Sequence, residues 1–365
     1  MQQHGSHHKA TLAGLIVALG IIYGDIGTSP LYVFSAIAGR RIITEDLILG
    51  GLSCIIWTLT LVTTVKYVLV TLRADNHGEG GIFSLYTLVR RRSRWLIIPG
   101  VIGGCALLAD GMITPPISVS SAVEGLEALI PNIPTVKIVV IILTGLFIFQ
   151  QFGTGIVGRW FGPIMFVWFA MIAVFGFAHL VKNPAVLKAL NPWYAYHLLV
   201  EYPHGFWILG AVFLCTTGAE ALYTDLGHCG LKNIQVSWMF VKLSLLLNYF
   251  GQAAFLLTIQ GQVLDASGKT TTGLTPFYSL MPGWFLPAGI FIATVAAVIA
   301  SQAIISGAFT LIAEAIRLNL WPKVRIKYPS NLKGQIYVPS ANRILWIGCI
   351  AVIIWFQRAS NMEAA

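Results

Sequence analysis

The sequence Tyr23-Gly24-Asp25-Ile26-Gly27-Thr28-Ser29-Pro30 interrupts an otherwise apolar stretch that extends from residue 11 to residue 37. Each glycine weakens a helix by about 1 kcal/mol, and proline removes a backbone donor and kinks the chain. Serine and threonine hydroxyls can satisfy the backbone groups that such a break sets free inside lipid. The stretch therefore predicts a membrane-spanning helix that is broken near its middle.

The composition of the chain agrees with a membrane protein. Of its 365 residues, 56% are hydrophobic and only 10% are charged, with a mean hydropathy of +0.78, whereas soluble proteins average about 25% charged residues. A bilayer core about 30 Å thick needs about 20 apolar residues per helical span. Hydropathy predicts nine such spans, at residues 11–37, 47–72, 95–129, 134–151, 156–180, 206–228, 234–259, 283–316 and 336–358. The expected fold class is an all-α integral membrane protein.

A second interruption lies in the sixth predicted span, where Cys215-Thr216-Thr217-Gly218-Ala219-Glu220 stands in the apolar run. Broken helices at corresponding places in two halves are typical of inverted-repeat transporters. We therefore expect a single transporter domain over residues 1–365, with discontinuous helices 1 and 6. Its first repeat covers residues 11–180, and a second, incomplete repeat at 206–365 lacks its tenth span. The chain is expected to be a truncated form of a longer transporter.

The basic residues are concentrated in particular loops between the predicted spans. They gather after the second and the eighth predicted spans, at Arg73, Arg90, Arg91, Arg92 and Arg94, and at Lys323, Arg325, Lys327 and Lys333. The positive-inside rule places these loops and the N-terminus in the cytoplasm. Because the basic residues lie in loops next to the lipid bilayer, the membrane explains the net charge of +9. We therefore expect no nucleic-acid partner.

Two further features fit the same membrane topology. The first span is not followed by a cleavage site, so no removable signal peptide is expected. The aromatic segment 191–203 is too polar to span and is expected to lie at the membrane interface. The five cysteines have no metal-ligand spacing.

Three acidic residues lie near the centres of apolar spans, at Asp25, Asp110 and Glu220. A charge at mid-membrane costs at least about 2.5 kcal/mol, so such residues by default mark ion pathways. Hydroxyls that can join them in binding a cation are Thr28, Tyr32, Thr114, Thr216 and Thr217. Asp110 and Thr114 share one helix face because they are four residues apart. The alternative is structural, since Asp25 or Glu220 could cap a half-helix.

Three carboxylates in a low-dielectric site cannot all be charged without compensation, because burial and like charge favour the protonated form. Bound cations and protons would then share the site. This predicts cation uptake coupled to protons, with Asp110 or Glu220 as the group that titrates. No cofactor is expected apart from the transported ions.

At these residues the chain resembles the Kup/HAK/KT family of potassium uptake permeases. The stretch from Tyr23 to Tyr32 is similar to the signature of that family, and the resemblance extends over essentially the whole chain, including 73–82, 111–127, 219–229, 247–252, 299–307 and 334–339.

The resemblance implies a LeuT-like fold and potassium–proton symport across the cytoplasmic membrane of a bacterium. It also implies a potassium site formed by Asp25, Tyr32, Asp110, Thr114 and Glu220. Family members normally continue beyond residue 365, and the resemblance implies a homodimer through parts that this chain only partly includes.

Three other functions stay open from sequence. An amino-acid transporter of the same fold would place a half-helix N-terminus against a substrate carboxylate, which three acidic side chains would repel. A membrane-embedded aspartyl hydrolase could use Asp25 and Asp110 as a dyad, but it would leave Glu220 and the helix breaks unexplained. A channel-like protein or a non-transporting sensor is the third alternative.

Overall fold

The computed structural model describes residues 11–75, 80–89, 94–130, 132–152, 158–329 and 336–363. Within these ranges every regular element is helical, apart from two isolated β-bridges. Among the described residues, eight helices are long and apolar enough to cross a membrane, or nine segments if a bent pair counts as one span. Each overlaps one predicted run, so the all-α membrane class is confirmed.

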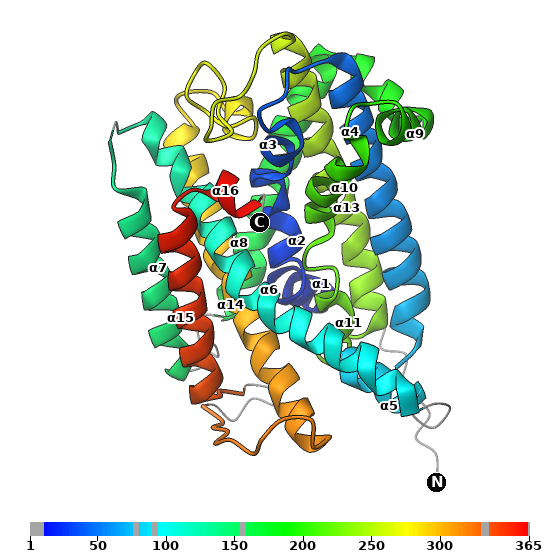
Figure 1. Ribbon diagram of the computed structural model, residues 1–365, viewed down its shortest axis with the longest axis vertical. Coiled ribbons are helices and arrows are strands. Elements are labelled where there is room, and N and C mark those ends of the chain that lie inside the picture. The colour runs from blue at the N-terminus through cyan, green and yellow to red at the C-terminus, as the bar shows by residue number, and fades with distance from the viewer. Residues whose placement is uncertain are drawn as a thin grey trace.

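The helices are labelled as in Figure 1. They are α1 Leu12–Ile21, α2 Gly24–Thr28, α3 Val33–Ala38, α4 Glu45–Thr58, α5 Ile82–Val89, α6 Ile97–Val123, α7 Thr135–Phe149, α8 Gly158–Lys182, α9 Trp193–Val200, α10 Gly205–Phe213, α11 Ala221–Thr224, α12 Leu226–Cys229, α13 Leu231–Leu256, α14 Leu286–Arg317, α15 Pro339–Phe356 and α16 Ala359–Glu363. A π-helical stretch, Leu59–Val70, prolongs α4.

The first span is broken where the glycines and the proline predicted it. Helix α1 ends at Ile21, and the chain then turns by 70° into the segment Gly24–Leu31. Glycine is required at the turn because a Cβ on Gly24 would lie 2.9 Å from the Cα of Ala300 in α14. The first span therefore loses its regular backbone hydrogen bonds at the place where it packs closely against α14.

The sixth span is interrupted as well. Helix α10 ends at Phe213, a short 3-10 turn follows, and α11 begins only at Ala221. Gly218, inside the interruption, has a φ of 85°, a conformation that glycine adopts without steric cost. Both predicted helix breaks are present.

Helix α2 lies at the centre of the helical bundle (Figure 1). It packs on α14, α14 packs along α6, and α1 packs against α8 and α13. Helices α7 and α15 lie side by side on one flank, and α4 and α9 lie on the other. The two broken spans are thus enclosed by longer continuous helices.

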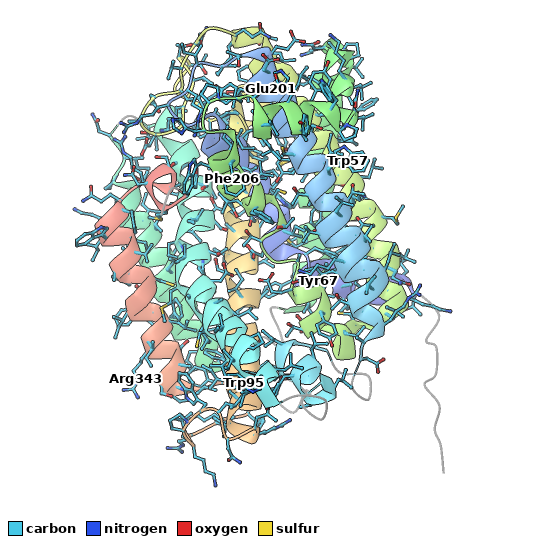
Figure 2. The ribbon with its side chains drawn as sticks, turned by 45° about the vertical axis from the view of Figure 1, so that its right-hand side comes forward. Trp57, Tyr67, Trp95, Glu201, Phe206 and Arg343 are labelled. Carbon is cyan, nitrogen blue, oxygen red and sulfur yellow. The ribbon has the colours of Figure 1, made fainter. Side chains whose placement is uncertain are left out.

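The two ends of the bundle differ in charge. The start of α1, helix α5 and the connection after α14 lie at one end (Figure 1). It is here called the basic end because the connection after α14 carries Lys323, Arg325 and Lys327. Trp95 and Arg343 lie toward the same end and Glu201 toward the opposite end (Figure 2). Residues 1–10, Arg90, Arg91, Arg92 and Lys333 lie outside the described residues. The predicted interfacial segment contains α9, where Trp193 is 57% exposed.

Candidate functional site

Three acidic side chains from separate parts of the chain meet between the two helix breaks. Asp25 comes from α2, Asp110 from the middle of α6, and Glu220 from the residue just before α11. Each offers one carboxylate oxygen, and these three oxygens all lie within 4.8 Å of one another. The structure therefore brings together all three predicted acids, hereafter called the acidic triad.

The triad is short of hydrogen-bond donors, and Asp25 is its most buried member. Asp25 is 3% exposed, and neither of its carboxylate oxygens has a partner among the described residues, nor does Oδ2 of Asp110. Two unit charges no more than 4.8 Å apart repel by at least about 3.5 kcal/mol at an effective dielectric constant of about 20. A cation between the three oxygens would offset this repulsion and would supply the missing partners.

The predicted hydroxyls stand in different relations to the triad. Thr114 donates to Oδ1 of Asp110 at 2.6 Å, one helical turn away. Thr28 donates instead to the main-chain oxygen of Asp25 at 2.9 Å, and the hydroxyl of Tyr32 lies 3.5 Å from Ser29 Oγ. Thr217 lies in the turn that interrupts the sixth span. Thr216 donates to the main-chain oxygen of Phe213 at 2.9 Å, so of these five hydroxyls Thr114 is the one that bonds to a triad carboxylate.

A small cavity of about 50 Å³ adjoins the triad. All three carboxylate residues line it, together with Gly218 and several small residues of α14 such as Ala303 and Gly307. A water-sized particle needs about 10–15 Å³ of such space. The cavity can therefore hold a few waters or a partly dehydrated small cation.

The two breaks touch directly. A Cβ on Gly218 would lie 2.7 Å from Asp25 Cβ and 2.8 Å from the main-chain nitrogen of Ile26. No side chain fits between these two segments, so the position of Asp25 depends on the backbone of the sixth span.

Several residues around the site were not predicted. Ser118 Oγ lies 3.4 Å from the hydroxyl of Thr28, and its spacing of four residues from Thr114 could have revealed it. Trp168 donates its indole N–H to the Gly27 carbonyl at 2.9 Å, and Gln252 donates to the Pro30 carbonyl at 2.8 Å. Both donors come from distant helices, and no local pattern marks them.

Comparison with known proteins supplies the family. The model of the K+ potassium transporter integral membrane domain matches residues 12–365. This chain belongs to the potassium transporter family. Relatives include proteins named "Probable potassium transport system protein Kup" from Cytophaga hutchinsonii, 62% identical over 100% of this chain, and from Clostridium perfringens, 55% identical over 99%. A relative of the same name from Enterococcus faecalis is 50% identical over 98% of the chain.

The family resemblance inferred from sequence is thereby confirmed, and the relatives are named as transport proteins rather than enzymes. The chain spans about half the length of the curated relatives it matches, 55% of the Cytophaga protein and 56% of the Clostridium protein. The roles of the predicted site residues in binding a cation stay predictions.

Proposed function

We propose that the protein containing this chain takes up potassium ions across the cytoplasmic membrane of a bacterium and binds them at the acidic triad. The observation that carries the proposal is the meeting of three carboxylates within 4.8 Å at two helix breaks, with both oxygens of the buried Asp25 unpartnered among the described residues. The relatives are named as potassium transport proteins, and these names are the reason for proposing potassium as the ion.

Potassium is a hard cation and prefers oxygen ligands. In the proposed site Asp25, Asp110 and Glu220 supply the charge, and Thr114 orients Asp110. Thr28, Tyr32 and Thr217 are proposed to contribute oxygens in conformations that bring them nearer to the ion. An amino-acid substrate fits less well, because its carboxylate would meet three acidic groups.

Proton symport is part of the same proposal. When no cation is bound, the repulsion within the triad favours a proton on one carboxylate. Asp110 and Glu220 are the candidates, because each is less deeply buried than Asp25 and can exchange a proton with water more readily. If that carboxylate keeps its proton while the other two hold the potassium ion, both ions are carried in the same direction, as symport requires.

The proposal includes the architecture and the orientation. We infer a LeuT-like arrangement of inverted repeats, in which helices 1 and 6 carry the breaks and the second repeat is completed by a further span. The basic end and the N-terminus are proposed to face the cytoplasm, in accordance with the positive-inside rule. A homodimer would form through regions that the longer relatives possess.

The test is rubidium entry into cells that lack potassium uptake and express the complete gene. Asp25→Asn keeps the size of the side chain and removes its charge, so we expect uptake to be abolished. The matched control is Asp46→Asn, because Asp46 is exposed in the first turn of α4, and it should leave uptake unchanged. Normal uptake by the Asp25→Asn protein would refute the proposed site.

A pH gradient imposed at fixed membrane potential tests the coupling separately. Symport predicts faster rubidium entry when the outside is more acidic. An uptake rate that does not respond to the gradient would exclude proton coupling and leave the cation site standing.

A further inference from the structure

A groove lies on one flank of the bundle, between α7 and α15. The two helices run side by side there (Figure 1), and Arg343, which lines the groove, lies toward the basic end (Figure 2). The groove has a volume of about 330 Å³ and is here called the α7–α15 groove. None of the described residues that line it also lines the cavity at the acidic triad.

The α7–α15 groove opens toward lipid. Both helices are long and apolar enough to cross a membrane, and apolar side chains cover their outer surface, with Ile148 54% exposed and Ile347 60% exposed. Aliphatic side chains that are exposed on a spanning helix contact the acyl chains of the bilayer. Since α7 ends and α15 begins at the basic end, lipid headgroups lie at the level of Arg343.

The charge of the groove is positive. Arg343 is the one charged side chain among the described residues that line it, and the first turn of α15 contains no acidic residue. Tyr337, just before α15, and Asn342 also line the groove, so the N-terminal end of this 18-residue helix borders it. Such an end carries a partial positive charge and attracts anions. The groove therefore favours a negatively charged headgroup.

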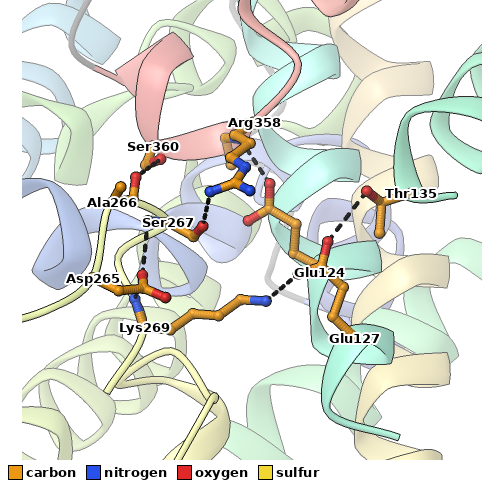
Figure 3. Close-up of polar contacts among 10 residues, drawn as sticks. Glu124, Glu127, Thr135, Asp265, Ala266, Ser267, Lys269, Arg358 and Ser360 are labelled. Atoms are coloured by element: carbon orange, nitrogen blue, oxygen red, sulfur yellow. Dashed lines mark hydrogen bonds and ion pairs between the residues drawn. The ribbon is translucent and has the colours of Figure 1, made fainter. Parts of the chain in front are cut away.

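Arg343 has no partner of opposite charge in the described part of the chain. Its Nε donates to the carbonyl of Pro339 in the same helix, at a distance of 3.4 Å. Polar contacts at the opposite end of the molecule differ, because a basic side chain there has an acidic partner, as in the ion pair of Lys269 with Glu127 (Figure 3). The guanidinium of Arg343 is thus available to an anion from outside the chain.

Beside Arg343, the groove is lined by a buried side chain with an unpartnered polar atom. Asn342 is 8% exposed, and its Nδ2 donates to the Phe147 carbonyl of α7 at 3.1 Å. This bond fixes the orientation of the amide, because a flipped amide would bring two oxygens together. Oδ1 of Asn342 has no partner among the described residues, and a buried acceptor left unpaired costs free energy. A ligand with a hydroxyl donor would supply the missing hydrogen bond.

We propose that the α7–α15 groove binds an anionic phospholipid whose headgroup carries hydroxyls, such as phosphatidylglycerol. The phosphate binds the guanidinium of Arg343, whose planar fork matches phosphate oxygens. A headgroup hydroxyl donates to Oδ1 of Asn342, and an acyl chain follows Ile148 and Ile347. Basic pockets between membrane helices typically bind anionic lipid headgroups. Because the groove is separate from the triad, this lipid site does not depend on the proposed potassium transport.

Other phospholipids fit the groove less well. Phosphatidylcholine has no net charge, and its headgroup has no donor for Oδ1 of Asn342. Phosphatidylethanolamine has a donor, but its ammonium group would lie beside Arg343, where like charges repel. A headgroup with hydroxyls and a net negative charge meets both requirements.

The first experiment measures lipid binding to the complete, purified protein by native mass spectrometry. Dioleoyl phosphatidylglycerol is titrated into wild type, Arg343→Gln and the control Arg325→Gln. Arg325 is a matched control because it is exposed at the same end and does not line the groove. We expect the dissociation constant of the most tightly bound lipid to rise about tenfold in Arg343→Gln, which corresponds to 1.4 kcal/mol, and to stay unchanged in Arg325→Gln.

Three outcomes would overturn the lipid site. Equal losses in the two arginine variants would show that the lipid responds to overall charge and not to the groove. No tight binding of phosphatidylglycerol to the wild-type protein would show that the remainder of the longer chain fills the groove. Competition by inorganic phosphate at the same concentration as the lipid would show that the groove binds a free anion.

A second experiment tests the hydroxyl contact with a matched pair of lipids. Dioleoyl phosphatidylmethanol has the charge and the acyl chains of dioleoyl phosphatidylglycerol, but its headgroup has no hydroxyl. Wild type should bind phosphatidylglycerol several-fold more tightly, whereas Asn342→Leu should bind the two lipids alike. The ratio of the two affinities separates this contact from any loss of stability that follows from breaking the bond to Phe147. Equal binding of both lipids by wild type would refute the contact with Asn342.

Discussion

Replacing Gly218 by alanine is expected to damage the acidic triad directly, because this glycine separates the two helix breaks. The new Cβ would lie 2.7 Å from Asp25 Cβ and 2.8 Å from Asp25 Oδ2. At a φ of 85°, a residue other than glycine costs about 1–2 kcal/mol, and an overpacked methyl group adds about 1–3 kcal/mol. The expected strain is therefore about 2–5 kcal/mol, which can be relieved only by moving Asp25 or the turn itself.

The assay measures two quantities on the complete protein: its melting temperature in detergent and its rate of rubidium uptake in cells. We expect Gly218→Ala to lower both, and a displaced Asp25 should reduce uptake at least about tenfold, since 1.4 kcal/mol already corresponds to that factor. Gly210→Ala is the control in the same broken span, because its Cβ would meet nothing within 4 Å and alanine favours a helix by about 1 kcal/mol. If both variants melt and transport alike, the two breaks do not touch as described.

Three further predictions concern contacts around the site. Thr114→Val removes a hydrogen bond to Asp110 of the charge-assisted kind worth about 1.5–3 kcal/mol, so the half-saturating rubidium concentration should rise about tenfold; an unchanged value would show that the hydroxyl does not serve the site. Gln252→Leu leaves a buried proline carbonyl without its donor at a cost of about 1–3 kcal/mol, which should appear as a lower melting temperature. Lys269→Met should destabilise more than the double substitution with Glu127→Gln, because the single change leaves one partner of the ion pair unpaired; equal melting temperatures would argue against the pair.

The features that depend on local chemistry can be predicted from the amino-acid sequence alone. Helix breaks follow from glycine and proline within an apolar run, so the positions of both breaks can be predicted from residue types alone. The importance of Asp25, Asp110 and Glu220 follows from the cost of placing a charge in lipid, and that cost also implies that they face one another. The spacing of Thr114 from Asp110 predicts that they share a helix face, where their hydrogen bond forms.

Contacts between distant segments could not be predicted in this way. The donor to the Gly27 carbonyl is Trp168, 141 residues away, and the chain has 11 tryptophans, so residue type alone does not single this one out. Gly218 looks like a helix breaker, yet its closest neighbour is Asp25 of another span. Such approaches depend on how whole helices pack, which hydropathy and residue spacing do not specify.

The hydrogen bonds at the first helix break explain why the polar atoms without a partner there belong to a carboxylate and not to the backbone. A break in lipid must satisfy the carbonyls that it frees, and three of them accept hydrogen bonds from the side chains of Thr28, Trp168 and Gln252. With these carbonyls satisfied, the side-chain atoms of this break that have no partner in the described part of the chain are the two carboxylate oxygens of Asp25. The fold at the break is thus held by neutral donors, and the attraction for a cation comes from the Asp25 carboxylate. For this reason Asp25→Asn should remove binding while preserving the break, whereas the loss of Gln252 should weaken the break itself.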